Sequence, residues 1–175
     1  QRRPNPLSDN TGALAADNRR GTTMRNVTAT GTVPAPRSSV WAVLADYPNI
    51  VDWNRAVKES YAIGDAVEGV GAQRQVNVGS KGSIRNRETV TEWEPEHRMV
   101  IAVDQIEKQP ISQATMTFTL SDGDGATPFS MSYDYEPQGG PLALIYGPLL
   151  DRLLAKGFGD FIDDLGPAAQ ARTAE

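Results

Sequence analysis

Hydrophobic and polar residues alternate along most of the chain between residues 57 and 135. Alternation with a period of two is typical of strands in a sheet that has one buried face and one face in water. Turn-forming sequences such as Asp122-Gly123-Asp124-Gly125 separate the alternating segments. The pattern therefore predicts a run of antiparallel strands. They cover residues 57–63, 74–78, 84–93, 98–106, 115–120 and 129–135.

The stretch Val33–Trp53 precedes these strands and breaks at prolines into two short helices. Prolines at positions 34 and 36 stop a first strand at Val33, because proline cannot donate to a strand ladder. Ser38 or Ser39 can then cap a helix whose apolar residues recur at helical spacing. A proline at position 48 ends this helix and opens a second turn that reaches Trp53.

A long helix is predicted near the carboxyl end, beginning near Leu142 or at Pro148 and reaching Leu165. Gly157 and Gly159 weaken it by about 1 kcal/mol each, which indicates close packing or bending. Its apolar face is broad enough that it must lie across the sheet. That face consists of Leu149, Leu150, Leu153, Leu154, Gly157, Phe158, Phe161, Ile162 and Leu165.

The two ends of the chain are expected to lie outside the folded domain, which covers residues 25–166. Residues 1–24 carry prolines, glycines and two arginine pairs with few apolar side chains, which predicts a disordered leader. The alternative is an arm that docks on a protein partner through Leu7 or Leu14. Residues 167–175 are expected to form a disordered tail.

The composition excludes several kinds of chemistry. The chain has no cysteine and one histidine, His97, so thiolate nucleophiles, disulfides and histidine-rich zinc sites are ruled out. A net charge of −5 and a pI near 4.9 argue against binding of nucleic acid. No apolar run approaches the roughly 20 residues of a membrane span. We therefore expect a cytoplasmic protein with no integral membrane segment, no metal and no cofactor.

In this order of elements the chain resembles the START-like, Bet v 1-like helix-grip (SRPBCC) superfamily. Within that superfamily it resembles the polyketide cyclase/dehydrase and lipid-transport family. The resemblance covers roughly residues 25–165 and is carried by the stretch Val33–Trp53, by Gly69–Arg74 and by Arg87–Arg98. It implies an α+β fold in which a curved antiparallel sheet of about seven strands grips the long helix around a ligand cavity. Family members bind lipids, quinones or polyketides, and a minority catalyse cyclisation or dehydration, so membership alone does not settle function.

Strand parity places two charged residues on the inward face of this sheet. If Ser80-Lys81-Gly82 forms a three-residue hairpin loop, Arg74 lies opposite Glu88. By the same parity Asn86 and Gln105 also point inward. The pair is either a salt bridge at the end of the cavity or a device that orients a polar group of the ligand, because buried charges are costly unless they are paired or used.

These observations predict binding of an apolar small molecule, with Arg74, Glu88 and Tyr133 as polar anchors. One alternative is an enzyme of the polyketide cyclase or aromatase type that uses Glu88 as base together with Arg74. Another is a lipid or quinone carrier that acts with a protein partner. Trp53 contacts the ligand or packs in the core. The predicted ligand-binding residues are Trp53, Arg74, Asn86, Glu88, Ile101, Met116, Phe118, Met131, Tyr133, Leu149 and Leu153.

Overall fold

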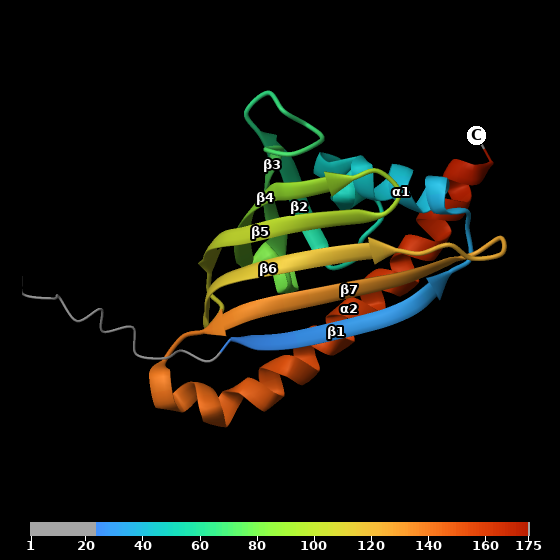
Figure 1. Ribbon diagram of the computed structural model, residues 1–175. Helices are drawn as coiled ribbons and strands as arrows, with labels where there is room; N and C mark the ends of the chain where they lie inside the picture. Colours follow the sequence, from blue (N-terminus) through green and yellow to red (C-terminus); the bar gives the residue numbers. More distant parts are fainter. Residues whose placement is uncertain (1–23, 175) are drawn as a thin grey trace, which may run out of the picture.

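The computed structural model describes residues 24–174 (Figure 1), so the predicted leader lies outside the described residues except for Met24. Residues 24–174 form seven strands, two α-helices and three short 3-10 helices. In order they are β1 (Arg25–Val33), α1 (Arg37–Ala45), η1 (Tyr47–Asp52), β2 (Val57–Ile63), β3 (Gln73–Val78), η2 (Ser80–Gly82), β4 (Ile84–Glu94), β5 (Arg98–Glu107), β6 (Ile111–Leu120), β7 (Thr127–Pro137), η3 (Gly140–Leu142) and α2 (Ala143–Thr173).

The strands form one sheet in the order β1-β7-β6-β5-β4-β3-β2, and all neighbours are antiparallel. The sheet curves, and α2 crosses one face of it, packing mainly on β1 and β7 (Figure 1). Helix α1 packs against α2. This arrangement confirms the predicted α+β helix-grip fold.

Helix α1 begins without the serine cap that its sequence favours. Its first residue is Arg37 and its cap position is Pro36, which has extended backbone geometry and makes no side-chain cap. Ser39 lies inside the helix, where its hydroxyl accepts a hydrogen bond from Thr173 at 2.8 Å. The prediction of a cap at Ser38 or Ser39 was therefore wrong, because the serine is used to hold the other end of the chain.

The long helix continues through Pro167 to Thr173, where a disordered tail was expected. Ala169 is fully buried in the core, and the Gln170 side chain donates to the Pro34 carbonyl at 3.1 Å. Arg172 forms an ion pair with Asp46 at 2.5 Å. These contacts with the segment around α1 order the last two turns, and sequence composition carried no sign of them.

Close approach between α2 and the sheet depends on Gly31 of β1. A Cβ atom at this position would lie 2.9 Å from Cγ2 of Ile162, which is closer than side chains pack. Glycine here allows the helix to sit directly on the edge strand. Within residues 24–174, none of the helices is both long enough and apolar enough to cross a membrane.

An ionic contact fixes the first half of α2 to the sheet. The Arg25 guanidinium donates to both carboxylate oxygens of Asp151, and the Tyr135 hydroxyl donates to Oδ1 of Asp151 at 2.7 Å. The hydrogen bond from Arg25 is the main cause that holds the pKa of Asp151 below its usual value. Burial, together with the contact to Asp151, raises the pKa of Tyr135 to about 12.

This contact makes stability depend on pH in the acid range. Since the pKa of Asp151 is lower in the folded than in the unfolded chain, its stabilisation is complete above roughly pH 4 and is lost as the pH falls through the folded pKa. We expect Asp151→Asn to lower the free energy of unfolding at pH 7 and to flatten its fall below pH 4. Urea unfolding at several pH values measures both effects, with the exposed Asp163→Asn as control. An unchanged acid limb in Asp151→Asn would contradict this assignment.

Candidate functional site

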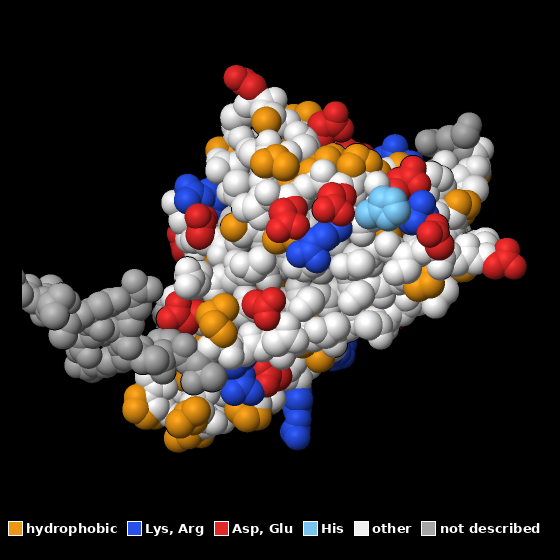
Figure 2. All heavy atoms as spheres, in the orientation of Figure 1, with side chains coloured by type: hydrophobic (Ala, Val, Ile, Leu, Met, Phe, Trp, Pro, Cys, Tyr) orange, Lys and Arg blue, Asp and Glu red, His pale blue; other side chains and the backbone are white. Residues whose placement is uncertain are grey.

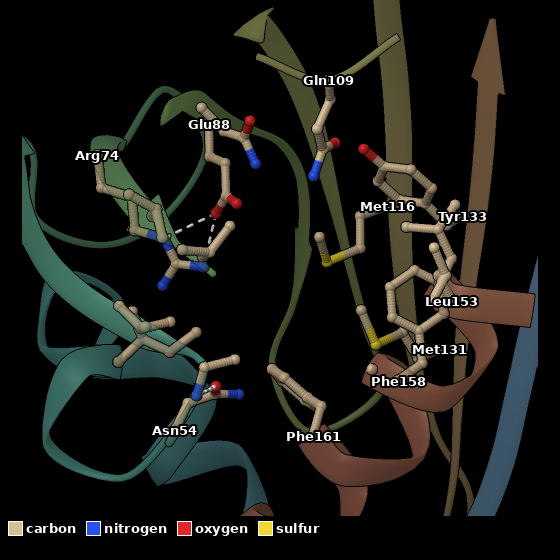
Figure 3. A pocket seen from close by; sticks show the side chains of 18 residues that line it. Asn54, Arg74, Glu88, Gln109, Met116, Met131, Tyr133, Leu153, Phe158 and Phe161 are labelled. Carbon is tan, nitrogen blue, oxygen red and sulfur yellow. Dashed lines mark hydrogen bonds and ion pairs between the residues drawn. The ribbon is translucent and has the colours of Figure 1, made fainter. Parts of the chain in front are cut away.

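A cavity of about 200 Å³ lies between α2 and the concave face of the sheet (Figure 3). It is closed at one side by the turn that follows α1. Its wall is formed by Ile50, Asn54, Ala56, Val57, Arg74, Val76, Val78, Asn86, Glu88, Gln109, Met116, Met131, Tyr133, Leu153, Leu154, Gly157, Phe158 and Phe161.

A buried ion pair forms the polar side of this cavity. The β3–β4 hairpin pairs Arg74 with Glu88, the register that the sequence predicts, because Gly82 takes up the left-handed backbone conformation that the turn requires. Arg74 Nε donates to Glu88 Oε2 at 2.8 Å, and Nη2 lies 2.6 Å from the same oxygen. Both residues are only 4% exposed.

Arg74 finds its remaining partners in the turn η1. Its Nη1 donates to the backbone carbonyl of Tyr47, and its guanidinium carbon lies 4.0 Å from the centre of the Tyr47 ring. A cation over an aromatic face in a desolvated site is stabilised by the ring quadrupole. Carboxylate, carbonyl and ring together surround the guanidinium, which offsets the cost of burying its charge.

Other polar groups at the cavity lack partners within residues 24–174. Oδ1 of Asn86 is buried without a hydrogen bond. The two hydrogen bonds that Glu88 accepts from Arg74 both end on Oε2, so Oε1 is left without a protein donor. Burial, and less strongly the Glu88 carboxylate, raise the pKa of Tyr133 well above its usual value, so its hydroxyl stays protonated. The cavity thus offers acceptors at Asn86 and Glu88 on one side and the neutral hydroxyl of Tyr133 on the other.

The opposite side of the cavity is mainly apolar, with Tyr133 beside methionine and phenylalanine side chains (Figure 3). Met116 and Met131 come from β6 and β7, and Phe158 and Phe161 come from α2. Methionine side chains are flexible and polarisable, so they adapt to ligands of irregular shape. The site therefore combines a rigid polar wall with a deformable apolar one.

Seven of the predicted ligand-binding residues line the cavity, and four do not. Trp53 packs behind the wall, with its ring centre 5.0 Å from that of Phe161. Phe118 stacks on the same phenylalanine at 5.4 Å, and Ile101 is fully buried in the core. Leu149 points into solvent and is 60% exposed. The seven are Arg74, Asn86, Glu88, Met116, Met131, Tyr133 and Leu153.

Parity fails at Gln105, which was expected to face inward and is exposed. Its φ angle is +48°, and the pairing of β4 with β5 shifts register between Arg85 and Arg87. Such a bulge turns the following side chains to the other face of the sheet. Asn54 and Gln109 line the cavity from connecting segments, where strand periodicity carries no information. Phe158 and Phe161 were predicted only as part of the apolar helix face.

The described residues contain no group of three or more histidine, aspartate or glutamate side chains placed to hold a metal ion.

A family model described as polyketide cyclase / dehydrase and lipid transport matches residues 24–170. The chain belongs to this family. A sequence comparison with functionally described proteins gave no match.

Several solved structures have the same fold as this member of the family, at low sequence identity. TTHA0849 from Thermus thermophilus is 17% identical with a TM-score of 0.71, covering 84% of this chain and 98% of its own. The Zhui aromatase/cyclase from Streptomyces sp. R1128 is 18% identical with a TM-score of 0.71, covering 86% and 96%. Ara h 8.0201 is 12% identical with a TM-score of 0.66, covering 85% and 99%. At these identities the likeness establishes the fold.

The ion pair predicts a specific pattern of stability changes. Arg74→Met leaves Glu88 buried without its partner and should lower the free energy of unfolding by about 3–5 kcal/mol. Adding Glu88→Leu removes the second charge and should restore most of that loss. Urea denaturation measures both variants.

A control variant at Arg87, next to Glu88 on β4, separates the effect of burying an ion pair from the effect of losing a charge. Arg87→Met breaks the more exposed pair between Arg87 and Asp104 and should cost less than about 1 kcal/mol. Equal losses in Arg74→Met and Arg87→Met would show that burial of the first pair carries no penalty.

Proposed function

We propose that this protein binds an apolar small molecule that donates a hydrogen bond, such as a phenol, an enol or an alcohol. The observation that carries the proposal is that some polar groups of the cavity wall have hydrogen-bond partners in the protein and others have none. Arg74 has its partners within the protein, whereas Glu88 Oε1 receives no hydrogen bond from residues 24–174 and Asn86 Oδ1 is buried without one. A buried acceptor without a donor is costly, and a ligand hydroxyl would supply that donor.

The volume of the cavity limits the size of the ligand. About 200 Å³ is less than the roughly 300–1,000 Å³ of typical small-molecule sites. A compact ring system fits within it, and a longer chain would have to extend past one of the exposed members of the lining, which are Ala56, Leu153 and Gly157. Mass spectrometry of small molecules extracted from the purified protein would identify the natural ligand directly.

Glu88→Gln tests the hydrogen bond. We expect wild type to bind 2-naphthol about tenfold or more tightly than 2-methoxynaphthalene, because only the first compound donates a hydrogen bond to a carboxylate. In Glu88→Gln we expect the amide oxygen to face Arg74 and the NH2 group, which only donates, to face the cavity. The preference should therefore fall toward unity, while affinity for 2-methoxynaphthalene does not fall. Fluorescence titration of both probes measures it. A preference that survives in Glu88→Gln would refute the role of Glu88.

Gly157→Leu tests the position of the ligand. A Cβ atom at either Gly157 or Gly159 would meet nothing within 4 Å, but only Gly157 lines the cavity. Both leucine variants should therefore fold and gain helix propensity of about 1 kcal/mol. Gly157→Leu should weaken 2-naphthol binding by about tenfold or more, and Gly159→Leu should leave it within about twofold. Equal affinity in the two variants would place the ligand elsewhere.

The second candidate is a polyketide cyclase or aromatase activity in the same cavity. It is favoured by a carboxylate, Glu88, that faces the cavity together with a protonated tyrosine, Tyr133, and by a structural neighbour named as an aromatase/cyclase. In this role Glu88 would remove a proton next to a ketone of the chain, and Tyr133 would donate to the resulting enolate. Turnover of a poly-β-ketone that disappears in Glu88→Ala would establish catalysis over binding alone.

The third candidate, a carrier that works with a protein partner, rests on the leader outside the described residues and stays a prediction. It shares the same cavity and ligand chemistry with the first proposal. Retention of a lipid or quinone in the extracted material would favour it.

A further inference from the structure

The first half of α2 exposes an unusual amount of apolar surface. Ile145 is 79% exposed, and Leu142, at the N-cap position, Leu149 and Leu153 are each at least 60% exposed. At 100° per residue these four side chains share one face, and we call them the apolar stripe. Figure 2 shows hydrophobic side chains gathered at the lower left, where this helix lies. Leu144 is 72% exposed as well but lies on the other side of the helix.

The orientation of this helix is fixed, so the stripe cannot simply turn inward. Ala143 and Gly147 are buried on the opposite side, and Asp151 is held by Arg25. A Cβ atom at Gly147 would lie 3.0 Å from the Arg25 guanidinium, so this side of the helix is packed as closely as it can be. The leucines of the stripe therefore stay outside while the helix remains anchored.

The exposed area of the stripe is large enough to indicate an interaction site, but it is smaller than the area that a stable dimer buries. Its side chains expose on the order of 500 Å², within the range of functional patches on monomers. A specific protein dimer buries roughly 800 Å² on each partner. A bilayer interface sets no such minimum, because each apolar side chain gains separately by entering it.

The stripe is continuous with the lining of the cavity. Leu153 is 61% exposed and also lines the cavity. Gly157, one turn further along α2, lines the cavity and is exposed as well. An apolar ligand that leaves past these two residues reaches the stripe before it reaches open water.

Basic side chains follow the stripe along the same side of the helix. Arg152 and Lys156 are exposed at the positions next to Leu149 and Leu153. Lys156 pairs with Asp160, and Asp151 is neutralised by Arg25. Arg152, for which residues 24–174 supply no ion pair, is therefore the cation that can reach a headgroup. Apolar residues beside such a cation are typical of helices that lie in the interface of an anionic bilayer.

We propose that the apolar stripe of α2 docks on the surface of a bilayer that contains anionic phospholipid, with the cavity opening at the interface. The ligand then passes between bilayer and cavity without crossing water. This inference rests on the proposed function, since only an apolar ligand gains from such an exchange. The docking is peripheral and needs no membrane-spanning segment.

Vesicle flotation with the full chain tests this proposal. We expect wild type to bind vesicles of phosphatidylcholine and phosphatidylglycerol, and Ile145→Ser/Leu149→Ser to bind at least about tenfold more weakly. The matched control is Val67→Ser/Val70→Ser, which removes two exposed apolar side chains from the β2–β3 connection and should bind like wild type. Arg152→Gln should weaken binding to these vesicles and leave binding to pure phosphatidylcholine vesicles unchanged.

Three outcomes would overturn the docking proposal. They are no binding of wild type to the anionic vesicles, equal loss in the two double variants, or a dimer in sedimentation equilibrium that Ile145→Ser/Leu149→Ser dissociates. The last would assign the stripe to a second copy of the chain. Titration with 2-naphthol keeps the two proposals apart, because neither double variant alters the cavity. Intact naphthol binding without vesicle binding refutes only the docking, whereas absent naphthol binding in wild type refutes the proposed function.

Discussion

One constraint decides where this fold can hold a ligand: a single helix must cover the whole concave face of a seven-stranded sheet. Seven strands spaced about 4.8 Å apart span roughly 30 Å, whereas a helix is only about 10 Å across. Helix α2 packs on β1 and β7 and is held there by Gly31 and by the contact between Arg25 and Asp151. The half of the sheet around β3 and β4 therefore faces the helix only across a gap. Curvature of the sheet narrows that gap, and what remains is the cavity.

The proposed function assigns structure and recognition to different atoms of the ion pair in this gap. Arg74 makes its contacts to Glu88 and to the backbone and ring of Tyr47, so its charge is satisfied without a ligand. Glu88 is paired through one oxygen only. In a fully packed core, apolar residues of similar volume would be as stable as such a pair or more stable. A charged pair at the edge of a cavity therefore supports the proposal that the unpaired oxygen binds what enters the cavity.

The sequence predicted the parts of the site that depend on local geometry. A three-residue turn with Gly82 in a left-handed conformation fixes the register of β3 and β4, so the pairing of Arg74 with Glu88 followed by counting along the hairpin. The bulge at Gln105 broke the same counting rule, because nothing in the local sequence marks a register shift. Strand parity separates inward from outward, but it cannot separate cavity wall from filled core. Ile101 and Phe118 are buried on the inward face, as predicted, but other side chains cover them. Phe118 is covered by the ring of Phe161, and the position of that ring depends on tertiary contacts.

Helix α2 also shows what a sequence pattern cannot predict. Its broad apolar face was predicted to lie across the sheet, and from Phe158 to Ala169 it does. Nearer its start α2 extends past the edge strand β1 (Figure 1), so Leu149 and its neighbours have no strand against them. Helical periodicity reports which side chains share a face and not whether the chain supplies a surface to cover it. Leu153 belongs to the uncovered part of the helix and, like Gly157, also lines the cavity. The exposed leucines and the exposed part of the cavity lining on α2 therefore lie on one continuous stretch, from Leu149 to Gly157.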